Sequence, residues 1–280
     1  MIKKEPLIVA GIIGGIFLSS WFEFQPVKSL LDWKASRKAN TRIKNNYTYQ
    51  VYDFSENEIP FISVDILKGE HFWNPQVAIW LEDTTGKYLE TLFITTSTAK
   101  GLFYGGRSAS NFRDFDEKKI IEENASIRRV NALPHWAFKR NVKAEDGKMV
   151  PHPNNPIVDG ITGATPTDNF LFKSKPIKQS TLPSDFIIKV EVNVAFDQNE
   201  YYSEYDYLDD EVFHNGTGLL GQPSLIYQAK ISSQSNSPYY LMELIGHGHH
   251  SAQNGEINTD MSSITTARFI LERIVVKVNF

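Results

Sequence analysis

The sequence predicts a mainly β protein, an antiparallel β-sandwich with immunoglobulin-like layers. Three observations support this fold class: many short segments alternate apolar and polar residues, turn residues separate them, and few segments show helical spacing. Chains of many short strands with little helix typically pack two sheets face to face. We expect one such domain over residues 46–280, with a loop-rich and partly helical insertion at 101–168.

The clearest strand signal is a hairpin. Residues 76–82 and 88–96 are rich in β-branched and aromatic residues, and the segment between them contains Asp83 and Gly86, which favour a turn. The longest alternating run, at 185–196, predicts the strongest strand. Further strands are expected at 46–54, 61–67, 169–174, 225–231, 239–245 and 274–280. Within the insertion, residues 112–124 predict one surface helix.

The N-terminal segment 1–22 has the pattern of an export signal. Lys3 and Lys4 precede an apolar run from Pro6 to Phe22, and no Ala-x-Ala cleavage site follows, which favours an uncleaved signal anchor. The run is near the lower limit of about 17 residues for a transmembrane helix. A buried core helix is the alternative. Residues 23–45 form a basic juxtamembrane linker, so positive charge lies on both sides of the span and leaves its orientation open.

Composition excludes several classes of function. The chain has no cysteine, so it can hold neither a disulfide nor a thiolate metal site. Its net charge of −4 gives no reason to expect a nucleic-acid partner. The nucleophile elbow Gly-x-Ser-x-Gly, the phosphate-binding Gly-Lys-Ser/Thr loop and the zinc-protease His-Glu-x-x-His helix are all missing from the sequence. These observations favour a protein that is not an enzyme.

One short motif near the middle of the chain could carry chemistry. It runs from Asp159 to Thr165 and combines a carboxylate, two threonines and the slim residues Gly163 and Ala164. A hydroxyl that accepts a phosphoryl group needs exposure and space beside it, which small neighbours provide. The alternative is a structural turn, capped by Asp159, that leads into the strand at Asn169.

The motif resembles the flavinylation motif of FMN-binding domains in bacterial respiratory complexes. In that family the last hydroxyl receives FMN through a phosphodiester bond, which a separate transferase forms. The resemblance implies Thr165 as the acceptor and Asp159, Thr162, Gly163 and Ala164 as recognition residues.

A wider resemblance covers most of the predicted domain. The segment 77–92, the motif ahead of a strand, the run 186–193 and the segment 221–227 together resemble a bacterial family called domain of unknown function 2271. That family implies a small extracytoplasmic β-sandwich that accompanies flavin-transfer and membrane redox components. It implies no demonstrated reaction, and in such proteins the motif often serves as a structural lead-in to a strand.

Two further groups of residues are candidates for binding. His135 and Trp136, beside Lys139 and Arg140, could receive an isoalloxazine ring or a phosphate; alternatively, they anchor the insertion to the sandwich.

The second group is His247, His249 and His250 in a glycine-containing segment. They could bind zinc or copper with His214 or Asp260 as a further ligand, or they could be ordinary loop histidines. The acidic segment 197–217 lacks the spacing of a calcium loop, so we expect it to be solvated.

The sequence therefore predicts a membrane-anchored accessory protein, periplasmic or extracellular, that serves a flavin-linked redox system. It would carry FMN on Thr165 or act beside a protein that carries FMN, and a flavin transferase and membrane redox proteins are the candidate partners. A β-sandwich binding or scaffold module without a cofactor, or a histidine-rich metal-binding protein, are the alternatives.

Overall fold

The computed structural model describes residues 48–55, 60–101, 128–157, 160–176, 182–214 and 221–280. The chain divides between Thr48 and Tyr49, and the unit Tyr49–Phe280 contains the strands described below. The expected signal anchor, the basic linker, the helix at 112–124 and Asp159 lie outside the described residues. Within the described residues, no helix is long and apolar enough to cross a membrane.

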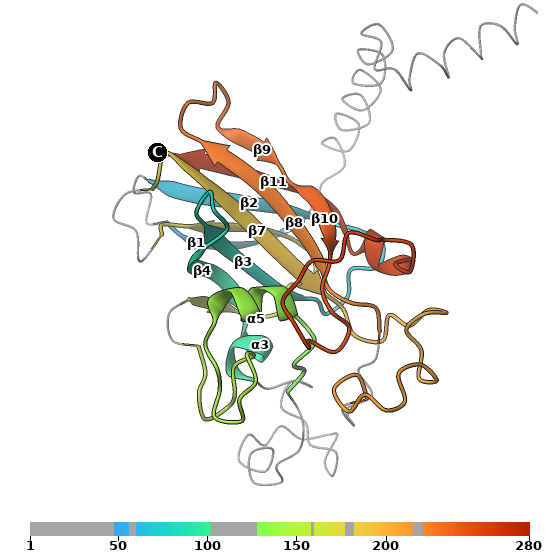
Figure 1. Ribbon diagram of the computed structural model, residues 1–280. Coiled ribbons are helices and arrows are strands. Elements are labelled where there is room, and N and C mark those ends of the chain that lie inside the picture. Colours follow the sequence, from blue (N-terminus) through green and yellow to red (C-terminus); the bar gives the residue numbers. More distant parts are fainter. Residues whose placement is uncertain (1–47, 56–59, 102–127, 158–159, 177–181, 215–220) are drawn as a thin grey trace, which may run out of the picture. The chain divides into compact units, whose positions relative to one another are not determined.

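The unit is mainly β, with its strands arranged in two mixed sheets (Figure 1). The first sheet has the order β1-β6-β2-β11-β9 and the second has the order β10-β8-β7-β3-β4-β5. The strands are β1 (Tyr49–Phe54), β2 (Phe61–Lys68), β3 (Gln76–Glu82), β4 (Tyr88–Thr95), β5 (Ile161–Gly163), β6 (Asn169–Ser174), β7 (Asp185–Asn193), β8 (Leu225–Ser232), β9 (Tyr239–Leu241), β10 (Glu243–His247) and β11 (Leu271–Asn279). The helices are α3 (Thr96–Lys100), α5 (Pro134–Arg140) and the 3-10 helix η1 (Thr266–Phe269).

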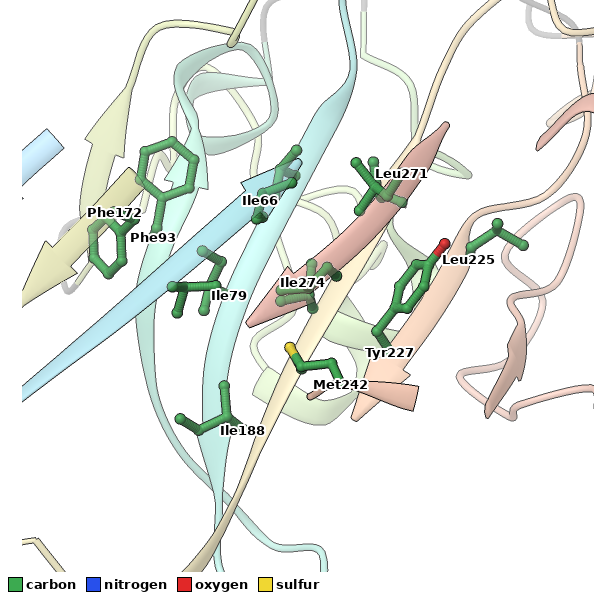
Figure 2. Packing of buried hydrophobic residues seen from close by; sticks show 14 of the residues in the cluster. Ile66, Ile79, Phe93, Phe172, Ile188, Leu225, Tyr227, Met242, Leu271 and Ile274 are labelled. Carbon is green, nitrogen blue, oxygen red and sulfur yellow. The ribbon is translucent and has the colours of Figure 1, made fainter. Parts of the chain in front are cut away.

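The two sheets bury a common core. Side chains from both sheets point toward one another in Figure 2, among them Ile66 and Ile274 from the first sheet and Ile79 and Ile188 from the second. These positions are fully or almost fully buried, as the inward half of each alternating strand pattern requires. The expected pairing of 76–82 with 88–96 is confirmed by β3 and β4, whose turn is closed by a hydrogen bond from Asp83 N to Lys87 O.

The prediction of purely antiparallel sheets is wrong at two edges. β1 pairs with β6 in parallel, and β5 pairs with β4 in parallel. Both pairs join segments that are far apart in the sequence, and a strand that arrives after a long connection can enter a sheet in either direction. A tight turn, by contrast, forces the antiparallel arrangement that β3 and β4 adopt.

The expected single strand at 239–245 is also corrected. The segment breaks at Met242 into β9, which pairs with β11 in the first sheet, and β10, which pairs with β8 in the second. The Met242 side chain is buried, and its amide donates to Ile274 O. One continuous segment thus forms an edge of each sheet.

One end of the two-sheet unit collects most of the long connections between the described strands. Lys68 at the end of β2 pairs with Leu271 at the start of β11, and Gln76 at the start of β3 pairs with Asn193 at the end of β7. β1 also begins here, because Tyr49 pairs with Asn169, whose side chain accepts a hydrogen bond from Lys68 N. We call this the loop-rich end; the Asp83–Lys87 turn lies at the opposite end.

Candidate functional site

The motif residues that the structure describes form a short edge strand followed by a connection. Thr162 and Gly163 lie in β5, which is the last strand of its sheet, and residues 164–168 lead into β6 in the other sheet. This corrects the expectation of a turn for the first half of the motif. Thr162 and Ala164 are exposed, and Thr165 is half-buried.

Gly163 is required by packing. A Cβ on Gly163 would lie 2.6 Å from Cε2 of Phe93 and 3.3 Å from Cε1 of Tyr52, so no larger residue fits without displacing these rings. Two hydroxyls hold the backbone on either side: Thr96 Oγ1 donates to Gly163 O over 2.9 Å, and the Tyr52 hydroxyl donates to Ala164 O over 3.3 Å. The motif backbone is thereby fixed.

The Thr165 hydroxyl stands outside this set of contacts. None of the described residues forms a hydrogen bond with it, whereas Thr167 exchanges two with the Gln50 side chain, at 2.9 and 3.1 Å. Among the residues that the structure describes, the hydroxyl therefore has no hydrogen-bond partner, although the backbone that carries it is positioned. Such a group can react without first losing a native contact.

His135 and Trp136 lie elsewhere, in α5, which packs against the outer face of the β3/β4/β7 sheet (Figure 1). Their side chains are 3% and 0% exposed. The indole Nε1 of Trp136 donates to Thr91 Oγ1 over 2.9 Å. Such burial favours the interpretation that these residues anchor the insertion, because a cofactor could not reach them without moving the helix.

A buried carboxylate holds the start of α5. Glu191 in β7 accepts hydrogen bonds from the backbone N–H groups of His135 and Trp136, at 3.2 and 2.7 Å, and from Ser224 Oγ at 2.5 Å. The first N–H groups of a helix have no partner within the helix, so a carboxylate at this place caps it. Burial raises the pKa of Glu191 to about 7, although these three donors oppose the rise.

A second buried group of charges lies beside it. Lys189 Nζ is 3.1 Å from Glu82 Oε2 and 3.1 Å from His135 Nε2, and the indole of Trp80 donates to Glu82 Oε1 over 2.9 Å. The other nitrogen of His135, Nδ1, lies 2.6 Å from Gly255 O. This geometry fits a neutral imidazole that donates from Nδ1 and accepts at Nε2.

The pKa values agree with that arrangement. Burial lowers the pKa of His135 to about 4, and the neighbouring Lys189 charge acts in the same direction. Burial also lowers the pKa of Lys189, while the Glu82 carboxylate opposes the change. Because these groups satisfy one another away from solvent, they can hold α5 on the sheet but do not offer an accessible acid, base or nucleophile.

The three predicted metal ligands are only partly brought together. His247 is buried in β10, and both its ring nitrogens face carbonyl oxygens: Nδ1 lies 2.7 Å from Gly248 O, and Nε2 lies 3.1 Å from Asp260 O. Each ring nitrogen of His247 therefore faces a carbonyl oxygen and not a space in which a metal ion could bind. Across the described residues, no group of three or more His, Asp or Glu side chains is placed to hold a metal ion.

His249 and His250 instead belong to a stack of rings. Their ring centroids are 4.5 Å apart, and the ring centroids of His250 and Tyr207 are 3.9 Å apart. Burial lowers the pKa of His250 to about 4, despite Asp210 Oδ2 at 3.8 Å. The stack ties the acidic segment to the Gly/His segment, so it has a structural explanation.

Sequence reasoning missed Glu82, Lys189, Glu191 and Ser224. A signal for two of them was present, because Lys189 and Glu191 occupy alternate positions of the strongest strand.

Comparison of the chain with protein-family models, with curated proteins and with solved structures found no match.

Proposed function

We propose that this is a membrane-anchored extracytoplasmic accessory protein of a flavin-linked redox system, with FMN bound to Thr165 through a phosphodiester bond. A transferase would supply the flavin mononucleotidyl group from a donor. The Thr165 oxygen would form the new P–O bond to the flavin phosphate, the bond between that phosphorus and the leaving group of the donor would break, and the leaving group would depart with the hydroxyl proton.

The observation that carries the proposal is the local geometry of Thr165. Its backbone is positioned by the contacts of Gly163 and Ala164, while its hydroxyl has no hydrogen-bond partner among the described residues. The exposed Thr162 and Ala164 beside it leave the edge of the sheet open to a transferase.

Co-expression with a flavin transferase tests the proposal. We expect in-gel flavin fluorescence and a mass increase of one FMN, both lost in Thr165→Ala. Thr167→Ala is the matched control, because that exposed hydroxyl lies two residues away on the same connection and should not be needed. An exported wild-type chain without flavin, or an equally labelled Thr165→Ala chain, would refute covalent attachment.

The packing of Gly163 favours a second candidate, a binding or scaffold module without a cofactor. The contact of Gly163 with Phe93 and Tyr52 accounts for the glycine of the motif without any transferase. In that case the wild-type chain stays unlabelled in the same experiment, and Thr165→Ala leaves stability and partner binding unchanged.

A further inference from the structure

Three aromatic side chains are exposed together at the loop-rich end. Trp73, Phe196 and Phe269 are 49%, 50% and 51% exposed, and they come from three separate connections. Large aromatic rings on a soluble surface are usually more buried than this, and an exposed cluster of them marks a binding surface. We call these three residues the aromatic cluster.

Local contacts link the three connections that carry these rings. The rings of Trp73 and Phe196 lie 6.2 Å apart, and those of His71 and Phe269 lie 6.3 Å apart. The backbone of the 69–75 connection is hydrogen-bonded to that of η1, because His71 N donates to Phe269 O over 3.1 Å. The Thr266 hydroxyl donates to the Asp197 carboxylate, next to Phe196.

The backbone keeps one of these connections in a costly conformation. Phe196 has φ of 63°, whereas Asn74, next to Trp73, has φ of 43°, which asparagine tolerates. The left-handed region is uncommon for residues other than glycine, and for a bulky residue it signals strain. Strained backbone concentrates at functional sites, and here it presents an apolar ring to solvent instead of burying it.

The chain enters the domain at the same end. β1 begins at Tyr49, which pairs with Asn169, and the Asn169 side chain accepts from Lys68 N at the end of β2, directly before the 69–75 connection. The apolar run predicted to span the membrane ends at residue 22, and only the 26 residues 23–48 separate it from Tyr49. The end that carries the aromatic cluster is therefore the end at which the chain arrives from the predicted anchor.

We propose that the aromatic cluster docks the domain on the lipid bilayer in which the chain is anchored. Tryptophan and phenylalanine favour the membrane–water interface, because their rings are apolar while the indole N–H can remain hydrated. A tether raises the effective concentration of the domain at the surface, so three rings suffice where a free protein would need a larger patch.

Charge indicates which lipids the surface needs. The acidic segment 197–214 lies at the same end and exposes Glu200, Glu204, Asp209 and Glu211. These carboxylates would be repelled by anionic headgroups, so docking should occur on neutral phosphatidylcholine without anionic lipid. The proposal rests on the proposed membrane anchoring and does not depend on FMN. Its bearing on the proposed function is that Thr165, in the connection between β5 and β6, would also face the membrane side.

The absence of cysteine makes a direct test simple. Single variants Trp73→Cys, Phe196→Cys and Phe269→Cys of the full chain each carry an environment-sensitive fluorophore in phosphatidylcholine vesicles that contain spin-labelled lipid. Phe280→Cys is the control, since Phe280 is 45% exposed and lies about 30 Å away at the far end of β11.

We expect several-fold stronger quenching by spin-labelled lipid at the three cluster positions than at position 280. A second variant adds Phe196→Asn to the Trp73→Cys chain. Asparagine tolerates the left-handed backbone at position 196, and the loss of the phenylalanine ring should reduce the quenching of the label at position 73. Equal quenching at all four positions, in a chain that floats with the vesicles, overturns the docking and leaves anchoring intact. Labels that are shielded from water but not quenched indicate a protein partner and also overturn it. A chain that does not float refutes the anchoring itself.

Discussion

Glu191 should make the stability of the wild-type chain depend on pH, and the substitution Glu191→Gln should remove this contribution. The folded pKa of Glu191 is about 7, raised from an ordinary value of 4.5. The unfolded chain therefore loses this proton at lower pH than the folded chain does. The stability linked to Glu191 is fully present below pH 4.5, and it is lost as the pH rises through 7.

The magnitude follows from the size of the shift. At about 1.4 kcal/mol per pKa unit, the free energy of unfolding contributed by Glu191 falls by roughly 2–3 kcal/mol between pH 5 and pH 8. His135 acts in the opposite direction, because its folded pKa is lowered from 6.5 to about 4 and its contribution is lost as the pH falls through that range. His250, with a pKa also lowered to about 4, adds to the loss in acid.

Urea denaturation of the detergent-solubilised chain, followed by tryptophan fluorescence, measures the effect. Comparison of Glu191→Gln with wild type at each pH cancels the histidine contributions. The variant should be less stable at every pH, since the new amide cannot accept all three hydrogen bonds, and its deficit should be roughly 2–3 kcal/mol larger at pH 5 than at pH 8. A deficit that is the same at both pH values would refute the raised pKa.

Two pairs of substitutions test the packing on either face of the second sheet. Lys189→Met should cost about 3–5 kcal/mol, because it leaves the Glu82 carboxylate buried with only partial compensation from Lys139 at 3.8 Å. Adding Glu82→Gln should recover most of that loss in the same denaturation assay; a cost below about 1 kcal/mol for Lys189→Met alone would contradict this account. Gly163→Ala should cost about 1–3 kcal/mol through the clash with Phe93, whereas Ala164→Val at the exposed neighbour should change stability by less than about 0.5 kcal/mol. Equal losses of stability in Gly163→Ala and Ala164→Val would show that β5 can shift enough to relieve the clash with Phe93.

Sequence patterns were sufficient for strands that pair locally. The hairpin of β3 and β4 was predictable because alternation, β-branched residues and the Asp83–Lys87 turn all indicate the same structure. The parallel placement of β1 and β5 was not, because edge pairing between distant segments leaves no local signal. The break at Met242 was hidden for a related reason: both halves of the segment read as strand, and only the three-dimensional fold assigns them to different sheets.

The buried charges under α5 show a different limit. Alternation along β7 places Ile187, Lys189 and Glu191 on one face, and a half-polar face normally indicates solvent. Here the insertion covers that face, and the charges pair with one another and with the start of α5. The grouping of His135 and Trp136 with Lys139 and Arg140 was visible in the sequence, but the helix α5 was not, because seven residues are too few to show helical periodicity.

The connection between β5 and β6 limits how freely an attached group could move. Residues 164–168 cross from one sheet to the other, and five residues reach at most about 20 Å, against a spacing of about 10 Å between packed sheets. Contacts of Ala164 with Tyr52 and of Thr167 with Gln50 shorten the free length further. A flavin on Thr165 would thus be attached to a short connection with a constrained backbone, and it could move little between an electron donor and an electron acceptor. Electron transfer through it would depend on how the whole domain is oriented toward its redox partners.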